Sequence, residues 1–284
     1  MSTQGRIKGT NIPIDYEATQ AFFDERGRRE YASALSTTMY QDNDPELVRQ
    51  RDQAEKAVLA PQLQLPAAAR ALDIGCGVGR WGWFLDQTVP GIDYLGIDFS
   101  EALIQKARQE ALQLGDNALR FQTMSAIDIQ PDELLIRPPF DLVIISGLLI
   151  YLNDADCIKV LRSACELCAP AGKIYLREPV GVQERLTLDR FYSEELKYEY
   201  SAIYRTVAEL EELLTQAELL PALRIQVSAC LFSADLEKER RLASTISSSK
   251  RVERHGHSLL LRSRWHLDSA GAAAIDRIVR WFGG

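Results

Sequence analysis

Three glycines stand at alternate positions in the segment Ala71-Leu-Asp-Ile-Gly-Cys-Gly-Val-Gly-Arg80. Apolar residues typical of a buried strand lead into Gly75, Gly77 and Gly79. Glycine lets the backbone turn sharply and approach a ligand closely, and the helix that follows such a loop offers unpaired N–H groups. We therefore expect a polar ligand at this loop. Asp73 precedes the loop, and its carboxylate would repel a pyrophosphate but attract a cationic amino group.

A dinucleotide-binding fingerprint is the alternative interpretation of these glycines. Residues 77–82 read Gly-Val-Gly-Arg-Trp-Gly and formally satisfy GxGxxG. In such a site the first glycine follows the strand closely, whereas here Gly75 and Cys76 already occupy that turn. An NAD-dependent enzyme is therefore a minor alternative.

A second carboxylate follows where the next strand should end. The segment Tyr94-Leu-Gly-Ile-Asp98-Phe-Ser puts Asp98 25 residues beyond Asp73. A carboxylate at this position accepts two hydrogen bonds from a ribose diol. Phe99 comes next and would offer a face to adenine.

The elements that position these residues alternate in type. Short apolar runs (ALDI, YLGI, LRFQTM, FDLVIIS and KIYLRE) are separated by helical patterns. This alternation predicts right-handed βαβ units and an α/β fold with a doubly wound, Rossmann-like parallel sheet. We expect residues 1–66 to form an N-terminal helical cap and residues 67–284 to form the catalytic domain. An insertion at about 180–205 would lie over the carboxyl edge of the sheet. Farther on, the pattern predicts a helix in TVAELEELLTQAEL, strands in LRIQVSACLF and HSLLLRSRWHL, and a terminal helix in AAAIDRIVRWFG.

Residues 68–180 resemble a class I S-adenosylmethionine-dependent methyltransferase. The resemblance rests on LDIGCGVGR as the glycine motif, GIDFS as the ribose motif and FDLVIISGLLIYLND as the motif of the fourth strand. It implies S-adenosylmethionine as the cofactor, with its methionine and ribose portion against the loop of Gly75, Cys76, Gly77 and Gly79. It further implies that Asp73 approaches the amino group, that Asp98 holds the ribose hydroxyls and that Ser146 faces the sulfonium.

The adenine end of the expected site departs from the family pattern. Members often carry an acid after the third strand that binds the adenine amino group. The matching position here is Ser125, and Asp128 comes three residues later. We therefore assign adenine recognition to Ser125 and Ala126.

Substrate-facing residues are expected beyond the carboxyl ends of the strands, where ligands bind in open α/β sheets. Tyrosine faces stabilise a sulfonium by about 0.5–2 kcal/mol through cation–π contact, and an arginine clamps a carboxylate with two hydrogen bonds. The alternative for each tyrosine is a lid residue packed on the core. The predicted catalytic residues are Tyr40, Glu178, Tyr204 and Arg205, and Tyr192 and Tyr200 are further candidates.

Composition limits the partners. The formal net charge is −7 and the pI is about 5.2, which disfavours a nucleic-acid partner. No apolar run has the length of a signal peptide or of a membrane helix, so we expect a cytoplasmic protein.

Five cysteines lack the spacing of a disulfide framework, and the CxxC of Cys165 and Cys168 has no second pair to complete a zinc site. His255 and His257 have no third ligand nearby in the sequence, and we expect no metal.

The leading functional hypothesis is a methyltransferase that acts on a small molecule, in specialised metabolism. A second enzymatic hypothesis keeps the cofactor but changes the reaction. In enzymes that resemble azetidine-2-carboxylate synthases, the cofactor's own amine attacks its γ-carbon and methylthioadenosine is released. A third hypothesis is a binding or scaffold protein without chemistry. The sequence leaves methyl transfer and cyclisation open.

Overall fold

The computed structural model describes residues 5–40, 42–113, 118–181 and 184–219, together with the backbone of two strands at 223–230 and 254–263. The predicted terminal helix in AAAIDRIVRWFG and the side chains of His255, His257 and His266 lie outside the part that is described.

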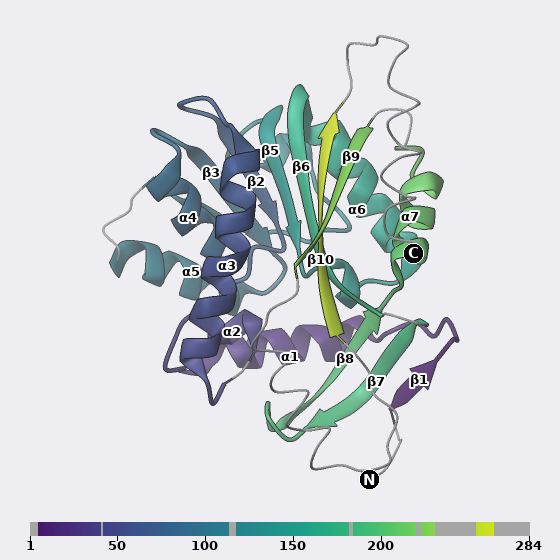
Figure 1. Cartoon of the computed structure of the whole chain (residues 1–284). Helices are drawn as coiled ribbons and strands as arrows, with labels where there is room; N and C mark the ends of the chain where they lie inside the picture. Colours follow the sequence, from purple (N-terminus) through teal and green to yellow (C-terminus); the bar gives the residue numbers. More distant parts are fainter. Residues whose placement is uncertain are drawn as a thin grey trace.

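The described strands form a central sheet of seven strands in the order β4-β3-β2-β5-β6-β10-β9 (Figure 1). The strands β2 to β6 are parallel to one another, and β10 is antiparallel to β6 and to β9. This confirms the predicted doubly wound α/β fold. The bounds are β2 Arg70–Ile74, β3 Asp93–Asp98, β4 Arg120–Thr123, β5 Phe140–Ser146, β6 Cys168–Gly181, β9 Leu223–Cys230 and β10 Arg254–Ser263.

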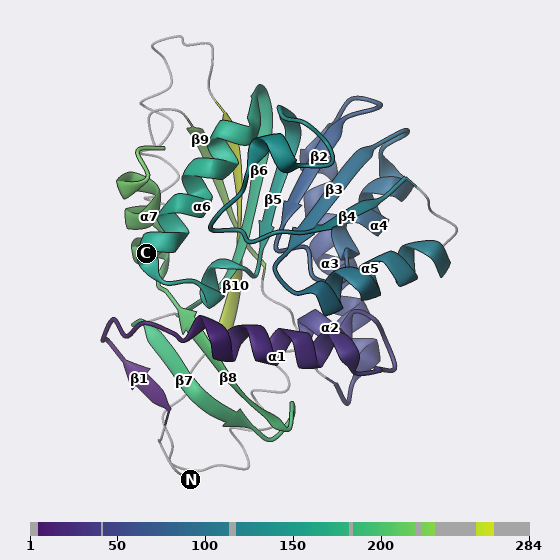
Figure 2. The same cartoon turned by 180° about the vertical axis from the view of Figure 1, so that it is seen from behind.

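Helices cover both faces of this sheet, because each parallel strand returns through a crossover. One face packs against α3 (Pro45–Leu63), α4 (Arg80–Thr88) and α5 (Glu101–Gln113). The other face packs against α6 (Asp154–Leu167) and α7 (Val207–Gln216). Figures 1 and 2 show the two faces, with α3 in front in one view and α6 in front in the other.

The two longer N-terminal helices each begin at an aspartate cap. Asp15 caps α1 (Tyr16–Arg28), and its carboxylate accepts hydrogen bonds from the N–H groups of Glu17 and Ala18. Asp44 caps α3 by accepting from the N–H of Leu47 at 3.0 Å, with Pro45 at the first helical position. A short helix, α2 (Ser36–Met39), stands between them.

A second sheet of three antiparallel strands lies at the carboxyl end of the central sheet, in the order β1-β7-β8. Its strands are β1 (Arg6–Lys8), β7 (Leu186–Ser193) and β8 (Tyr198–Tyr204). The β7–β8 hairpin falls in the segment predicted as an insertion. The N-terminal region is not wholly helical, because β1 pairs with β7. This sheet and α1 lie together across the lower end of the molecule (Figures 1 and 2).

The position of the site follows from the strand order. The chain passes from β2 through β3 to β4 on one side of the sheet and then crosses to β5 on the other side of β2. A crevice opens outside the carboxyl ends of the strands at such a switch point. The short helices η1 (Pro131–Glu133) and η2 (Leu149–Tyr151) flank β5, and η2 begins three residues after β5 ends.

Candidate functional site

The glycine loop joins β2 to α4 and is packed from two sides. The φ angles of Gly77 and Gly79 are 56° and 83°, in the region that favours glycine. A Cβ at Gly77 would lie 2.7 Å from Cγ2 of Thr38, and one at Gly79 would lie 2.5 Å from Cε1 of Phe121. Both conformation and space therefore require glycine at these two positions.

Asp98 lies at the end of β3, directly beside this loop. Its Oδ2 accepts a hydrogen bond from the N–H of Gly77 at 3.0 Å, and its Oδ1 accepts from the N–H of Ser100 at 3.0 Å. The side chain is buried, and burial raises its pKa to about 6. A carboxylate has about four lone-pair sites, so each oxygen keeps capacity for a ligand hydroxyl. This geometry fits the diol of a ribose.

Asp73 lies in β2 just before the loop and is almost fully buried. Its Oδ2 accepts a hydrogen bond from the hydroxyl of Tyr94 at 2.8 Å. Burial raises the pKa of Asp73 to about 7, against the opposing effects of Tyr94 and of the positive charge of Arg80. The carboxyl group thus changes its protonation state near neutral pH.

Two buried hydroxyls on α2 provide a test of whether a polar ligand fits here. Ser36 Oγ and Thr37 Oγ1 have no hydrogen-bond partner among the described residues, and α2 touches the loop through the next residue, Thr38. A buried hydroxyl left unpaired costs about 1–3 kcal/mol. A polar ligand that reaches α2 from the loop would offer them partners, and the carboxylates of Asp73 and Asp98 beside the loop fit the amino and ribose groups of such a ligand.

The carboxyl end of β5 carries Ser146 and then the turn into η2. Ser146 Oγ accepts a hydrogen bond from Nη2 of Arg80 at 2.9 Å. The hydroxyl of Tyr151, at the end of η2, is hydrogen-bonded to the hydroxyl of Tyr40. Burial raises the pKa of both phenols. Both therefore stay protonated at neutral pH.

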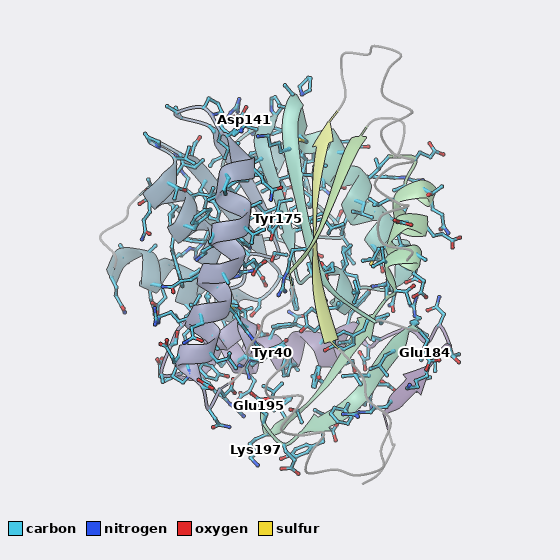
Figure 3. All side chains as sticks on the ribbon, viewed as in Figure 1. Tyr40, Asp141, Tyr175, Glu184, Glu195 and Lys197 are labelled. Carbon is cyan, nitrogen blue, oxygen red and sulfur yellow. The ribbon has the colours of Figure 1, made fainter. Side chains whose placement is uncertain are left out.

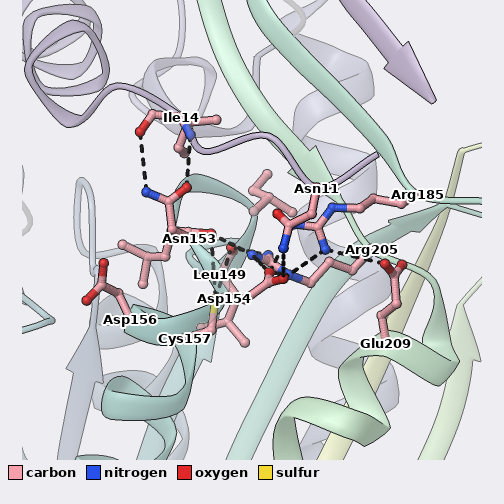
Figure 4. A network of polar contacts seen from close by, with 12 residues as sticks. Asn11, Ile14, Leu149, Asn153, Asp154, Asp156, Cys157, Arg185, Arg205 and Glu209 are labelled. Carbon is pink, nitrogen blue, oxygen red and sulfur yellow. Dashed lines mark hydrogen bonds and ion pairs between the residues drawn. The ribbon is translucent and has the colours of Figure 1, made fainter. Parts of the chain in front are cut away.

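Arg205 and Glu178 both hold η2 by hydrogen bonds to its backbone. The carboxylate of Glu178 accepts hydrogen bonds from the N–H groups of residues 148, 149 and 150 at 3.0, 2.9 and 3.3 Å. The guanidinium of Arg205 donates to the carbonyls of Leu149 and Leu152 at 2.7 and 2.6 Å and to Asp154 Oδ1 at 2.8 Å (Figure 4). All three guanidinium nitrogens of Arg205 therefore contact the chain itself. The assignment of Arg205 to a ligand carboxylate stays a prediction.

An aromatic cluster lies between η2, α1 and the β7–β8 hairpin. The rings of Phe22 and Tyr200 stack at 5.9 Å, and the rings of Phe23 and Tyr151 meet edge to face at 4.8 Å. Figure 3 shows Tyr40 at this lower end of the molecule. We call this set the aromatic cluster, and its members are Phe22, Phe23, Tyr40, Tyr151, Tyr200 and Tyr204.

The structure brings together three of the predicted tyrosines, Tyr40, Tyr200 and Tyr204, and leaves out Tyr192, which is 48% exposed. Tyr151 was missed. Its signal lay in the fourth-strand motif FDLVIISGLLIYLND, where it stands five residues after Ser146.

Residues 72–174 match a family model described as a methyltransferase domain. This segment is similar to methyltransferase domains. A demethylmenaquinone methyltransferase of Shouchella clausii is 29% identical over 119 residues, which are 41% of this chain and 48% of that protein. A 23S rRNA (uracil(1939)-C(5))-methyltransferase of Thiobacillus denitrificans is 31% identical over 111 residues, which are 38% of this chain and 23% of that protein. The chain spans about a quarter to a half of the length of such curated relatives.

Solved structures extend the likeness of the methyltransferase domain to most of the chain. The magnesium protoporphyrin IX methyltransferase of Synechocystis PCC 6803 with bound S-adenosylmethionine has a TM-score of 0.55 at 18% identity, over 90% of this chain and 100% of that one. The [4+2]-cyclase SpnF has a TM-score of 0.57 at 16% identity, over 90% of this chain and 99% of that one. At such identities the likeness establishes the fold alone.

The residues assigned to adenine lie in the methyltransferase domain just after β4. Ser125 and Ala126 are half-buried, and Asp128 is exposed. The N–H of Asp128 donates to the carbonyl of Ser125 at 3.2 Å, which forms a tight turn. Phe99 is half-buried and meets Phe23 edge to face at 5.9 Å. The assignment of Ser125 and Ala126 to adenine stays a prediction.

The cysteines of the methyltransferase domain are thiols in the part of the chain that is described. Cys76, Cys157, Cys165 and Cys168 form no disulfide, and burial raises the pKa of the Cys76 thiol well above its usual value. Among the described residues, no group of three His, Cys, Asp or Glu side chains is arranged to hold a metal ion. Nor does any described helix have the length and apolar character needed to cross a membrane.

Proposed function

We propose that this chain is an S-adenosylmethionine-dependent methyltransferase that acts on a small molecule. The observation that carries the proposal is the buried Asp98 carboxylate, hydrogen-bonded to the N–H of Gly77 in a loop that only glycine can form. This arrangement lies within the segment that matches the methyltransferase domain model. Asp98 would hold the ribose, the loop the methionine portion, and Asp73 the amino group.

When bound, S-adenosylmethionine supplies an electrophilic methyl group on a sulfonium. The chain then has to orient the acceptor and exclude water, since an in-line displacement gains most from positioning. The aromatic cluster suits this task, because its rings are largely buried between α1 and the β7–β8 hairpin. Tyrosine and phenylalanine faces also stabilise a cation by about 0.5–2 kcal/mol.

A small acceptor is favoured over a nucleic acid. The curated relatives include both kinds, since one is named for rRNA and others for demethylmenaquinone and phosphoethanolamine. The formal net charge of −7 opposes binding to a polyanion. The exclusion of nucleic acid, a cytoplasmic location and a place in specialised metabolism are parts of this proposal.

A cyclase that consumes S-adenosylmethionine is the second candidate, and the chemistry of Asp73 favours it. In that reaction the cofactor's amine nitrogen bonds to its γ-carbon, the carbon–sulfur bond breaks and its electron pair stays on sulfur as methylthioadenosine leaves. The amine must shed a proton, and Asp73, whose pKa burial raises to about 7, would accept it in this proposal. A similar fold also serves another kind of reaction, since the [4+2]-cyclase SpnF aligns over 90% of this chain and 99% of its own.

The products decide between the two candidates. Purified protein is incubated with S-adenosylmethionine, alone and with a metabolite extract, and cofactor-derived products are followed by mass spectrometry. S-adenosylhomocysteine that forms only with extract supports methyl transfer, whereas methylthioadenosine with azetidine-2-carboxylate from the cofactor alone supports cyclisation. An Asp98→Asn variant controls for non-enzymatic breakdown. Unchanged cofactor under both conditions would overturn both candidates.

A further inference from the structure

A cluster of charged side chains lies between α3 and the carboxyl end of β6, on the face of the sheet opposite to Glu178. Arg80 Nη1 contacts Asp52 Oδ1 at 3.0 Å, and Arg80 Nη2 contacts Glu55 Oε2 at 3.1 Å. Lys56 Nζ contacts Asp52 Oδ2 at 2.5 Å, and Arg177 Nε contacts Glu55 Oε1 at 3.2 Å. The hydroxyl of Tyr175, a residue labelled in Figure 3, also donates to Glu55 Oε1 at 3.0 Å.

The charges of this cluster do not balance. Three cations, Arg80, Lys56 and Arg177, meet two carboxylates, Asp52 and Glu55. Asp73 faces Arg80 from β2, but burial raises its pKa to about 7, so it is only partly ionised at neutral pH. If a cationic amino group of the cofactor binds Asp73, the charge of Asp73 is neutralised by that group. The three cations of the cluster then again exceed its two carboxylates by one. The cluster therefore favours one more anion.

Arg177 is the member that can meet that anion. Its side chain is 24% exposed, whereas those of Arg80 and Glu55 are 9% and 4% exposed. Glu55 engages Arg177 through Nε, and no hydrogen bond from its two terminal nitrogens is found within the described residues. A Cβ at Gly147 would lie 3.6 Å from Nη1, so the missing side chain leaves this end of the guanidinium uncovered.

The surroundings place this end of Arg177 at the candidate active site. The N–H of Gly147 donates to the carbonyl of Arg177 at 2.7 Å, and Arg177 pairs in register with Ser146 at the end of β5. Ser146 is in turn bound by Arg80. Arg177 thus stands where β5 and β6 both end, beside the loop that leads to Tyr151.

We propose that the terminal nitrogens of Arg177 form a carboxylate-binding subsite of the active site. The inference rests on the proposed function and deepens it, because it predicts which chemical class the site selects. The guanidinium fork matches a carboxylate with two parallel hydrogen bonds, and Glu55 fixes its orientation through Nε. The carboxylate belongs either to the amino-acid end of S-adenosylmethionine or to the acceptor, and both are recognised by the same chemistry.

The experiment compares Arg177→Gln with wild type and with Arg137→Gln, a matched change at a side chain that is 61% exposed near η1. Glu55 keeps Arg80 and Tyr175 as partners in the variant, which preserves the fold. Arg177→Lys, which keeps the charge but loses the fork, serves as a second variant. Circular dichroism and thermal melting verify that each variant is folded.

Two pairs of probes separate the sources of the carboxylate. Calorimetry measures S-adenosylmethionine against its decarboxylated analogue, and ligand-observed NMR measures benzoate against benzamide in the presence of S-adenosylhomocysteine. Charge-assisted hydrogen bonds of this kind are worth about tenfold or more in affinity. If the cofactor supplies the carboxylate, Arg177→Gln removes about a tenfold preference for S-adenosylmethionine over the analogue. If the acceptor supplies it, the variant instead removes the preference for benzoate.

The proposal is overturned if Arg177→Gln and Arg177→Lys leave both preferences as they are in wild type. Failure of the proposed function has a different signature, because wild type and Arg137→Gln would then bind neither S-adenosylmethionine nor S-adenosylhomocysteine.

Discussion

The Glu178→Gln variant tests how Glu178 holds η2, the short helix that ends at Tyr151. In the wild type, Oε1 of Glu178 accepts from the N–H groups of Leu148 and Leu149, and Oε2 accepts from that of Ile150 at 3.3 Å. An amide keeps one acceptor oxygen and puts an NH₂ group against the N–H of Ile150. A buried N–H left without an acceptor costs about 1–3 kcal/mol. We expect the variant to be less stable than wild type by this amount at pH 5.

The difference should shrink as the pH rises. Burial raises the pKa of Glu178 from an ordinary value of 4.5 to about 7 in the folded protein. The stability that the neutral carboxyl group contributes is complete below the unfolded pKa and is lost as the pH rises through the folded pKa. At about 1.4 kcal/mol per pKa unit, wild type loses about 2–3 kcal/mol between pH 5 and pH 8. Glutamine does not titrate, so its variant loses none of this.

Urea unfolding followed by tryptophan fluorescence, at intervals from pH 5 to pH 8, measures both effects. Other buried carboxyl groups, such as Asp73 and Asp98, titrate in wild type and variant alike and cancel in the difference. Glu211→Gln, at an exposed position of α7, is the control. A difference between wild type and Glu178→Gln that stays constant across this pH range would refute the reasoning.

Three further substitutions test other parts of the site. Arg205→Ala leaves two carbonyls of the η2 loop without their partner, whereas Asp154 keeps Arg185. At about 1–3 kcal/mol for each unpaired buried carbonyl, we expect a loss of about 2–6 kcal/mol in urea unfolding; a loss below about 1 kcal/mol would contradict the buried contact. Asp98→Asn removes charge-assisted acceptors and should weaken S-adenosylmethionine in calorimetry by about tenfold to a hundredfold; an unchanged Kd would exclude the ribose assignment. Tyr151→Phe removes the hydroxyl that meets Tyr40 and should lower kcat in the product assay while the fold persists by circular dichroism, whereas unchanged turnover would leave this hydroxyl outside the reaction.

Short-range features of the site could be predicted from the sequence. The glycine loop and the carboxylates of Asp73 and Asp98 occupy strand–turn–helix units whose geometry depends on neighbours in the chain. The cap at Asp44 is equally local, since its carboxylate contacts the N–H of residue 47. Local propensity and hydrophobic period act over this range, and the strands and helices expected for the central sheet agree with the structure, whereas the pairing of β1 with β7 was not expected.

Roles that depend on distant partners could not be predicted in this way. Arg205 and Tyr204 adjoin each other in the sequence, yet Tyr204 joins the aromatic cluster while Arg205 reaches carbonyls 53 and 56 residues away. A guanidinium in a tyrosine-rich insertion is compatible with a ligand clamp or with a buried brace, and its type alone does not distinguish them. Arg177 shows the opposite case: the sequence analysis predicts a role for its neighbour Glu178 and none for Arg177, whose contact with Glu55 spans 122 residues of the chain and is seen only in the structure.

The sequence by itself determined the alternation of strands and helices in the central sheet, the glycine loop and the acids beside it, because hydrophobic period and backbone conformation depend on adjacent residues. Only the tertiary structure decided which charged side chains are spent on the protein's own backbone and which remain exposed to a ligand. Glu178 and Arg177 alternate to opposite faces of β6, where one meets three N–H groups and the other meets Glu55 from α3. Those partners come from elements more than 25 residues away along the chain, and burial and charge act through space rather than along the sequence.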